Sequence, residues 1–360
     1  MINNSATFNG AHKLARSTKI PSTSSQASCV AILYENDAWL GDLFKELHNQ
    51  QVPFEPVRLD DAAVILDEAP MFPTVFNRVS PSSYIRGHGP AIGFAKSMLD
   101  LIAANGRRII NDGRAFRYET SKAAQVMLFQ QLGVATPRTL LFNSTGSVLE
   151  AARSFTFPAL LKPNCGGSGA FIRHVKSYEH LVNLLESEDD LFGPDHLLLL
   201  QEYVSSRDGS VVRIEFVDGQ LICAMRAFPT NTFNLCPAES CERTAANPAS
   251  SQKAAVRFEP YPDIPPDSVA QAREIARAAN IEVGGVEYIE AVDGTRVFID
   301  INASSVYRQE ICEALGTNAI ASLVEFISRE YHKELAKDRF MQATKASAKT
   351  SKAQQNGATL

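Results

Sequence analysis

Oxygen-bearing side chains near the C-terminus have the types and spacing of a divalent-metal site. Two runs of β-branched and aromatic residues flank an Asp-Gly turn signal at 293–294, which predicts a hairpin carrying Glu287, Asp300 and Asn302. Because side chains alternate faces along a strand, Asp300 and Asn302 point together, and Glu287 on the neighbouring strand can add a second carboxylate. Mg²⁺ favours such ligands, completed by water and substrate phosphates. The alternative interpretation is the solvated polar face of an ordinary hairpin.

A lysine before a glycine-rich turn predicts contacts with phosphate groups. Lys162 ends an apolar run, and the turn that follows consists of Gly166, Gly167, Ser168 and Gly169. The lysine supplies a positive charge, and the glycines let backbone N–H groups approach a phosphate closely. We therefore expect the turn to close over phosphates as a flap. The alternative is a plain flexible hairpin.

Composition excludes several classes of protein. The chain has 360 residues, 45% of them hydrophobic and 21% charged, which is typical of a soluble globular protein with two or three domains. No run approaches the roughly 20 apolar residues of a membrane span. The net charge of −5 argues against a general nucleic-acid binder. The dispersed cysteines lack zinc-site spacing and favour a reducing, cytoplasmic setting.

The order of the elements predicts an α/β protein that begins with an open α/β sheet. A strand at 30–34, a helix at 40–47 and a strand at 52–58 start this sheet. No G-x-G-x-x-G joins the first strand to its helix, so we expect no dinucleotide site there. Apolar periodicity predicts helices at 120–132, 178–186, 268–279 and 320–327, and strands at 158–163, 170–175, 197–204, 211–217 and 220–227.

Taken in order, these motifs resemble the ATP-grasp superfamily, and the likeness is greatest to RimK-like and glutathione-synthetase-like carboxylate–amine ligases. The resemblance covers about residues 72–330. It implies an ATP-grasp fold with an N-terminal open α/β domain, and ATP and Mg²⁺, or Mn²⁺, as cofactors. It is carried by Lys122, Lys162, the segment 201–204, Glu287, Asp300 and Asn302.

The resemblance also implies roles for individual residues. Lys122 and Lys162 would bind the nucleotide with the glycine turn. Backbone groups of a hinge at Glu202, Tyr203 and Val204 would meet the adenine, and Asn234 would lie near the nucleotide within a long polar loop. Among the arginines, Arg226 corresponds to the one that steadies the transferring phosphoryl group, with Arg213 as its rival.

Some positions depart from the family pattern. Asp300 stands where relatives often have Glu, so bridging of two ions is less assured. Val211 stands where RimK-like sequences tend to have an acidic residue for the ribose, and Asp208 is the candidate substitute.

The resemblance implies a division of the chain. The first 28 residues carry no acid and also fit an organelle transit segment, but a disordered tail is the preferred interpretation because no apolar periodicity supports a helix. The expected segments are a disordered tail at 1–28, the N-terminal α/β domain at 29–110, a linker with a central helical segment at 111–158, the first ATP-grasp lobe with the glycine flap at 159–204, the second lobe with the metal site at 205–335 and a disordered tail at 336–360.

The expected activity is ATP-dependent joining of a small-molecule carboxylate to an amine, such as an amino acid or peptide, through an acyl phosphate. Both substrates would enter from the N-terminal domain, with Arg78 and Arg86 as candidate anion contacts. The family suggests a homodimer. Two alternatives stay open: an ATP-grasp phosphotransferase to a small acceptor, and a non-catalytic nucleotide sensor.

Overall fold

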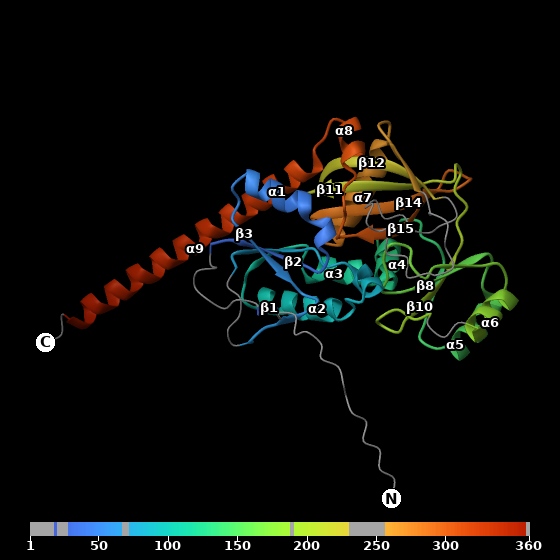
Figure 1. The fold of residues 1–360 in the computed structure, drawn as a ribbon, viewed down its shortest axis with the longest axis horizontal. Coiled ribbons are helices and arrows are strands. Elements are labelled where there is room, and N and C mark those ends of the chain that lie inside the picture. Colours follow the sequence, from blue (N-terminus) through green and yellow to red (C-terminus); the bar gives the residue numbers. More distant parts are fainter. Residues whose placement is uncertain (1–17, 20–27, 67–71, 188–190, 230–255, 358–360) are drawn as a thin grey trace, which may run out of the picture.

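The computed structural model describes residues 18–19, 28–66, 72–187, 191–229 and 256–357. Within these residues, a parallel sheet near the N-terminus is followed by a small antiparallel sheet and then by a larger one (Figure 1). A separate parallel pair joins β1 (Thr18–Lys19) to β4 (Ala62–Ala63). Residues 18–19 were expected in a disordered tail, so this part of the prediction is wrong.

The N-terminal sheet is parallel and has helices on both faces. Its elements are β2 (Val30–Tyr34), η2 (Asp37–Trp39), α1 (Gly41–Asn49), β3 (Phe54–Arg58), β5 (Thr74–Asn77), η3 (Pro81–Arg86), α2 (Pro90–Ala104) and β6 (Arg108–Ile110). The strand order is β3-β2-β5-β6. Along β2, Ile32 packs in one buried cluster with α1, whereas Leu33 packs in another with α2. This alternation confirms the predicted open α/β sheet.

The first lobe is a four-stranded antiparallel sheet in the order β7-β10-β8-β9. Its elements are β7 (Thr139–Phe142), α5 (Thr145–Ala151), η4 (Ala152–Ser154), β8 (Ala159–Pro163), β9 (Arg173–Val175), α6 (Tyr178–Ser187) and β10 (Leu198–Glu202). Leu200 of β10 pairs with Leu140 of β7 on one side and Leu161 of β8 on the other. The sheet therefore begins at β7, ahead of the predicted boundary at 159. The sequence indicates an extended run there but not its distant partner.

The second lobe is a five-stranded antiparallel sheet in the order β13-β12-β11-β14-β15. Its strands are β11 (Val211–Val217), β12 (Gln220–Pro229), β13 (Val256–Pro260), β14 (Val283–Glu290) and β15 (Arg296–Asn302). The predicted hairpin is β14–β15. Three helices share a buried cluster with this sheet, and α8 follows it: α3 (Gly113–Thr120), α4 (Lys122–Gln131), α7 (Pro266–Ala278) and α8 (Gln309–Ala314).

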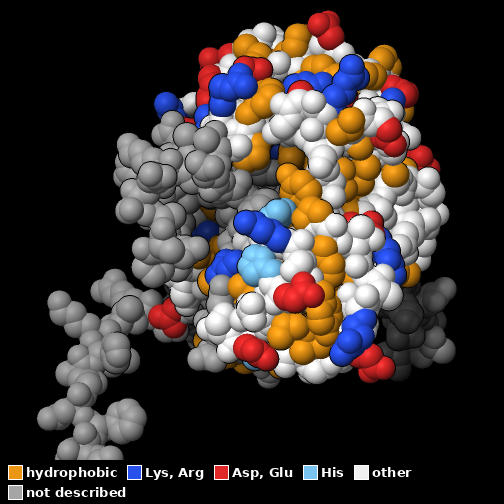
Figure 2. Space-filling model, turned by 90° about the vertical axis from the view of Figure 1, so that its right-hand side faces the viewer, with side chains coloured by type: hydrophobic (Ala, Val, Ile, Leu, Met, Phe, Trp, Pro, Cys, Tyr) orange, Lys and Arg blue, Asp and Glu red, His pale blue; other side chains and the backbone are white. Residues whose placement is uncertain are grey.

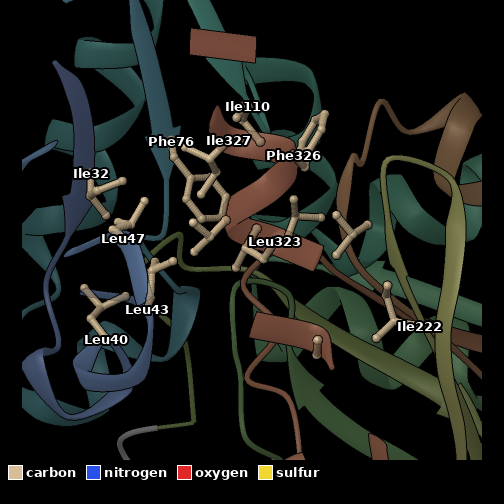
Figure 3. Close-up of a cluster of buried hydrophobic side chains, with 14 of the residues drawn as sticks. Ile32, Leu40, Leu43, Leu47, Phe76, Ile110, Ile222, Leu323, Phe326 and Ile327 are labelled. Carbon is tan, nitrogen blue, oxygen red and sulfur yellow. The ribbon is translucent and has the colours of Figure 1, made fainter. Parts of the chain in front are cut away.

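The long C-terminal helix α9 (Ala319–Gly357) links the N-terminal sheet to the second lobe. In Figure 3, Leu323 and Ile327 of α9 lie beside Phe76 of β5, and Ile222 of β12 belongs to the same buried cluster. Removing this apolar surface from water is worth roughly 25 cal/mol per Å². The cluster therefore fixes the N-terminal domain against the second lobe.

The second half of α9 extends away from the body (Figure 1). Residues 336–360 were expected to be disordered, but the helix continues to Gly357, so that prediction is wrong for the described part of the tail. The segment is rich in Ala, Lys, Gln and other good helix formers, and no Gly or Pro precedes Gly357 to stop a helix once it has started. No helix among the described residues combines the length and apolar character needed to cross a membrane.

Candidate functional site

A cavity of about 330 Å³ lies where the two lobes meet the N-terminal domain. Figure 2 shows the face that carries α5 and α6, where Lys, Arg and His side chains gather around a hollow near the centre. The cavity is lined by lysines, the glycine turn, the end of β10 and the β14–β15 hairpin, together with Trp39, Ser80 and Pro81 of the N-terminal domain. Elements far apart in the sequence thus converge on one space.

The predicted metal ligands lie together on the cavity wall. Glu287 of β14 pairs in register with Asp300 of β15, and Gly285 pairs with Asn302. The Asn302 side-chain nitrogen donates to Glu287 Oε1 at 3.1 Å. All three line the cavity. Among the described residues, no group of three or more Asp, Glu, His or Cys side chains has metal-site geometry, so a cation here would rely on two carboxylates and an amide.

The electrostatics of this wall suit a cation. Burial raises the pKa of Glu287 to about 7, with Arg213 opposing the rise and Asp300 adding to it. Burial also acts to raise the pKa of Asp300, but the charge of Lys122 holds it below its usual value. Two carboxylates crowded in a buried place are stabilised by positive charge. The donor set therefore fits a hard divalent cation.

Two lysines face this wall and differ in their contacts. Lys122, in the first turn of α4, donates from Nζ to Asp300 Oδ1 at 2.8 Å. Lys162, near the end of β8, donates from Nζ to the neutral Gln201 Oε1 at 2.7 Å. Burial, reinforced by the charge of Lys122, lowers the pKa of Lys162 to about 7. Among the described residues Lys162 has no ion pair, so its charge is available to an anion in the cavity.

The glycine turn reaches from the first lobe to the N-terminal domain. A Cβ atom on Gly167 would lie 2.9 Å from Ser82 Cβ, so only glycine allows this approach. Just beyond the turn, Phe171 stacks on Tyr84 with ring centroids 5.8 Å apart. Both contacts fall on η3. The turn therefore covers one side of the cavity and rests on the domain expected to bind the substrates.

The predicted hinge begins at Glu202, the last residue of β10. The Glu202 and Tyr203 N–H groups each donate at 3.0 Å, to Arg138 O and Pro158 O. The Tyr203 ring is 42% exposed and meets the His174 ring edge-on at 5.1 Å. Together with Val204, these residues line the cavity. The structure thus brings the hinge, the lysines and the hairpin to one space.

The two candidate arginines are placed differently. Arg226 lies outside the cavity wall, where its guanidinium donates to Asp208 at 2.9 Å and Glu290 at 3.0 Å. Its rival Arg213 lines the cavity and donates from Nη1 to Glu287 Oε1 at 2.7 Å. The role of Arg226 stays a prediction. Asn234 lies outside the described residues.

Sequence reasoning missed several residues of the wall. Glu119, at the end of α3, accepts hydrogen bonds from the Ala303 N–H and the Ser304 hydroxyl, and burial raises its pKa. Ser305 accepts a hydrogen bond from Arg213 Nη2 at its hydroxyl, at 2.9 Å. These residues hold the segment that follows the predicted ligand Asn302. No motif surrounds Glu119, and only the fold brings it to β15.

Comparison with known proteins places these features in context. The model of the RimK-like ATP-grasp domain matches residues 119–244. The sequence matches no curated protein. The structure is similar to the ATP-grasp ligase PsnB complexed with a minimal precursor, at a TM-score of 0.58 and 16% identity, covering 84% of this chain and 99% of that one.

Two further solved structures have a similar fold. D-alanine–D-alanine ligase from Bacillus anthracis has a TM-score of 0.59 at 13% identity and covers 87% of this chain and 100% of its own. A RimK domain ATP-grasp protein from Sphaerobacter thermophilus DSM 20745 has a TM-score of 0.58 at 16% identity and covers 83% and 98%. At these identities the likeness concerns the fold, and it confirms the predicted fold class.

Proposed function

Because the chain has the ATP-grasp fold and its residues 119–244 match the model of the RimK-like ATP-grasp domain, we propose that it is an ATP-dependent carboxylate–amine ligase. It would join a small-molecule carboxylate to an amine and release ADP and phosphate. Two of the similar proteins, PsnB and the D-alanine–D-alanine ligase, are ligases; one structure of PsnB holds Mg and ADP, and one of the D-alanine–D-alanine ligase holds ATP.

One observation carries this proposal: a buried lysine without an ion pair among the described residues lines the same cavity as two carboxylates, one buried and one partly buried. Lys162 is 6% exposed and bonded only to a neutral amide among its described contacts. Glu287, 4% exposed, has a pKa raised to about 7 by its burial. The phosphates of a nucleotide can pair with the Lys162 ammonium, and a divalent cation can bind the Glu287 and Asp300 carboxylates. A complex of a metal ion with a nucleotide therefore fits both sides of the cavity.

Glu287, Asp300 and Asn302 are the residues that would hold the metal. A bound Mg²⁺ supplies neutralisation of phosphate charge during phosphoryl transfer. The protein's own part on this wall is to keep the donors in place. Arg213 holds Glu287, and Glu119 holds the backbone just after Asn302.

The proposed reaction has two steps. An oxygen of the substrate carboxylate attacks the γ-phosphorus of ATP, the bond from phosphorus to the ADP oxygen breaks, and an acyl phosphate and ADP result. The neutral amine then attacks the acyl carbon, the carbon–oxygen bond to phosphate breaks, and the amine loses a proton as the amide forms. Lys162 and the N–H groups of the glycine turn stabilise the phosphoryl oxygens, and closure of the turn against Ser82 excludes water.

Two arginines compete for the role of steadying the transferring phosphoryl group. Arg226 matches the family pattern, whereas Arg213 lines the cavity. Replacing each in turn by Met and measuring the catalytic rate and ADP affinity separates them. Loss of rate in R226M with unchanged ADP affinity supports Arg226, and an unchanged rate in R226M transfers the role to Arg213.

The ligase function is tested by ADP release from ATP and Mg²⁺ with panels of carboxylic acids and amines, and by mass analysis of the products. Release that requires both an acid and an amine, with formation of their amide, supports the proposal. A phosphorylated acceptor as the final product identifies a phosphotransferase instead. Tight ATP binding without turnover for any pair identifies a nucleotide sensor.

A further inference from the structure

In the N-terminal sheet the chain adds strands first on one side of β2 and then on the other, and the carboxyl ends of β2 and β5 lie at this change of strand order, close to the cavity. β2 pairs with β3 on one side and with β5 on the other. The helices that follow β2 and β5, α1 and α2, belong to clusters on opposite faces. In open α/β sheets, ligands bind outside the strand ends at such a change of strand order. Ser80, shortly after β5, lines the cavity, so these strand ends adjoin the proposed active site.

Two arginines occupy this place, and one of them is already neutralised. Arg86 donates from two nitrogens to the buried carboxylate of Glu35 and from Nη1 to Ser82 Oγ at 3.0 Å. Its guanidinium also covers the Trp39 ring, 4.6 Å from the centroid. With its charge paired and its donors used, Arg86 has little left to offer a ligand.

Arg78 differs because two of its guanidinium nitrogens lack a hydrogen-bond partner, although the guanidinium lies over the Phe76 ring, 5.6 Å from the centroid. It directly follows β5, and its N–H donates to Leu33 O at 2.8 Å, which fixes the backbone at the strand end. The side chain is buried, with 6% exposure for the residue. Its Nη2 donates to Ser305 O at 2.8 Å, but Nε and Nη1 are buried and have no hydrogen-bond partner.

A buried cation with unused donors is unusual in a folded protein. The great majority of buried polar groups are hydrogen-bonded, because an unpaired donor loses its water without replacement. Glu119 and Glu215 act on Arg78 through charge, yet neither bonds to it among the described contacts. A planar carboxylate matches a guanidinium in both charge and shape.

The position of Arg78 separates it from the reacting groups. Ser305 lies between the two buried arginines, accepting from Arg213 at its hydroxyl and from Arg78 at its carbonyl. Arg213 donates to Glu287, one of the residues proposed to bind the metal. Arg78 therefore lies on the far side of Ser305 from the carboxylate to be activated, and it comes from the N-terminal domain.

Building on the proposed ligase function, we propose that Arg78 binds a second carboxylate of the substrates, one that does not react. The enzyme then acts on a pair of substrates of which one keeps a free carboxylate, as an amino acid or a dicarboxylic acid does. Ser304, Ser305 and Val306 line the cavity but Arg78 does not, so the proposal requires this segment to move when the carboxylate binds.

The test compares carboxylate substrates with their carboxamides on the wild-type protein. ADP release is measured with acid and amine pairs in which the non-reacting carboxylate is kept or replaced by a neutral amide, for example L-alanine against L-alaninamide as the amine. We expect kcat/KM to fall roughly a hundredfold for the carboxamide. Equal use of both forms overturns the inference while leaving the ligase function intact. Absence of turnover with every pair overturns the ligase function itself.

A variant then assigns the preference to Arg78. In R78Q, activity on the carboxylate substrate should drop to the level of the carboxamide, whereas activity on the carboxamide should change little, and ADP affinity reports that the nucleotide site is intact. The matched control is R86Q, which removes a paired arginine from the same strand ends and should keep the preference for the carboxylate. A preference that survives in R78Q, or disappears equally in R86Q, contradicts the assignment.

Discussion

The two walls of the cavity hold their charged groups differently, and the difference indicates what fills the space between them. On the first-lobe wall, Lys162 is a buried cation whose described partner is a neutral amide. On the hairpin wall, strand pairing holds the buried Glu287 near the partly buried Asp300, and these carboxylates accept from Arg213 and Lys122. Burial moves the pKa of Lys162 and that of Glu287 to about 7 from opposite directions. A phosphate would therefore pair with Lys162, whereas a divalent cation would add positive charge between Glu287 and Asp300.

Replacing Lys162 should have the largest effect on turnover. Lys162→Ala deletes the phosphate contact but little packing, so we expect turnover to fall by roughly 10²- to 10³-fold or more. Metal-free ADP binding should weaken as well. The control is K176A, which removes an exposed lysine just beyond β9. ADP release and thermal unfolding measure the outcome, and a fully active, folded K162A protein would refute the phosphate role.

The hairpin wall should respond to metal rather than to nucleotide. In Glu287→Gln one carboxylate becomes a neutral amide, so we expect Mg²⁺ affinity to fall roughly a hundredfold, while metal-free ADP binding stays the same or improves because a negative charge is gone. The matched control is E282Q, another arginine-paired glutamate, which lies outside the cavity wall. Titration of activity with Mg²⁺ decides the matter. An unchanged Mg²⁺ dependence would remove Glu287 from the metal site.

The pH dependence of metal-free ADP binding should report on Lys162 and not on the hairpin carboxylates. Lys162 has a pKa lowered to about 7, so it is largely neutral at higher pH and must take up a proton to pair with a phosphate. We expect metal-free ADP affinity to fall by up to about tenfold per pH unit above pH 7 and to level off below it. K162M should lose this component. Calorimetry at about pH 8.5 in buffers of different ionisation enthalpy should show proton uptake only for the wild type. Proton release there would contradict the expected sign.

Local pattern predicted β8, β10, β11, β12, β14 and β15, because their apolar periodicity and turn signals are contained within each element, but it did not predict α5 or β13. The hairpin with Glu287 and Asp300 was predicted, since turn and strand alternation together set its register. Contacts between distant segments could not be predicted in this way. Glu119 reaches Ala303 only through the packing of α3 against the second lobe, and the pairing of β7 with β10 depends on the tertiary fold.

At the C-terminus, the sequence predicted disorder where the structure has a helix. Its low hydrophobicity favoured disorder, yet a helix already anchored at Leu323 and Ile327 continues through residues that favour helix, because propagation costs less than nucleation. The arginines after β5 show a further limit. The sequence placed Arg78 and Arg86 together, but only the structure shows that Glu35 neutralises one and leaves the other without a carboxylate partner among the described residues.

The smallest expected effect tests how the two walls are closed over a ligand. In Gly167→Ala the new Cβ would meet Ser82, at 2.9 Å from its Cβ and 3.1 Å from its backbone nitrogen, so the glycine turn must move away from η3. We expect kcat/KM to fall roughly fivefold with little change in stability, because positioning of the phosphate contacts is disturbed while the core is not. The control is G93A in α2, where a Cβ meets nothing within 4 Å and alanine favours the helix. Since Lys162 and Glu287 keep their places in G167A, the loss should appear at every Mg²⁺ concentration and every pH. A loss confined to low Mg²⁺ would instead tie the turn to the hairpin wall.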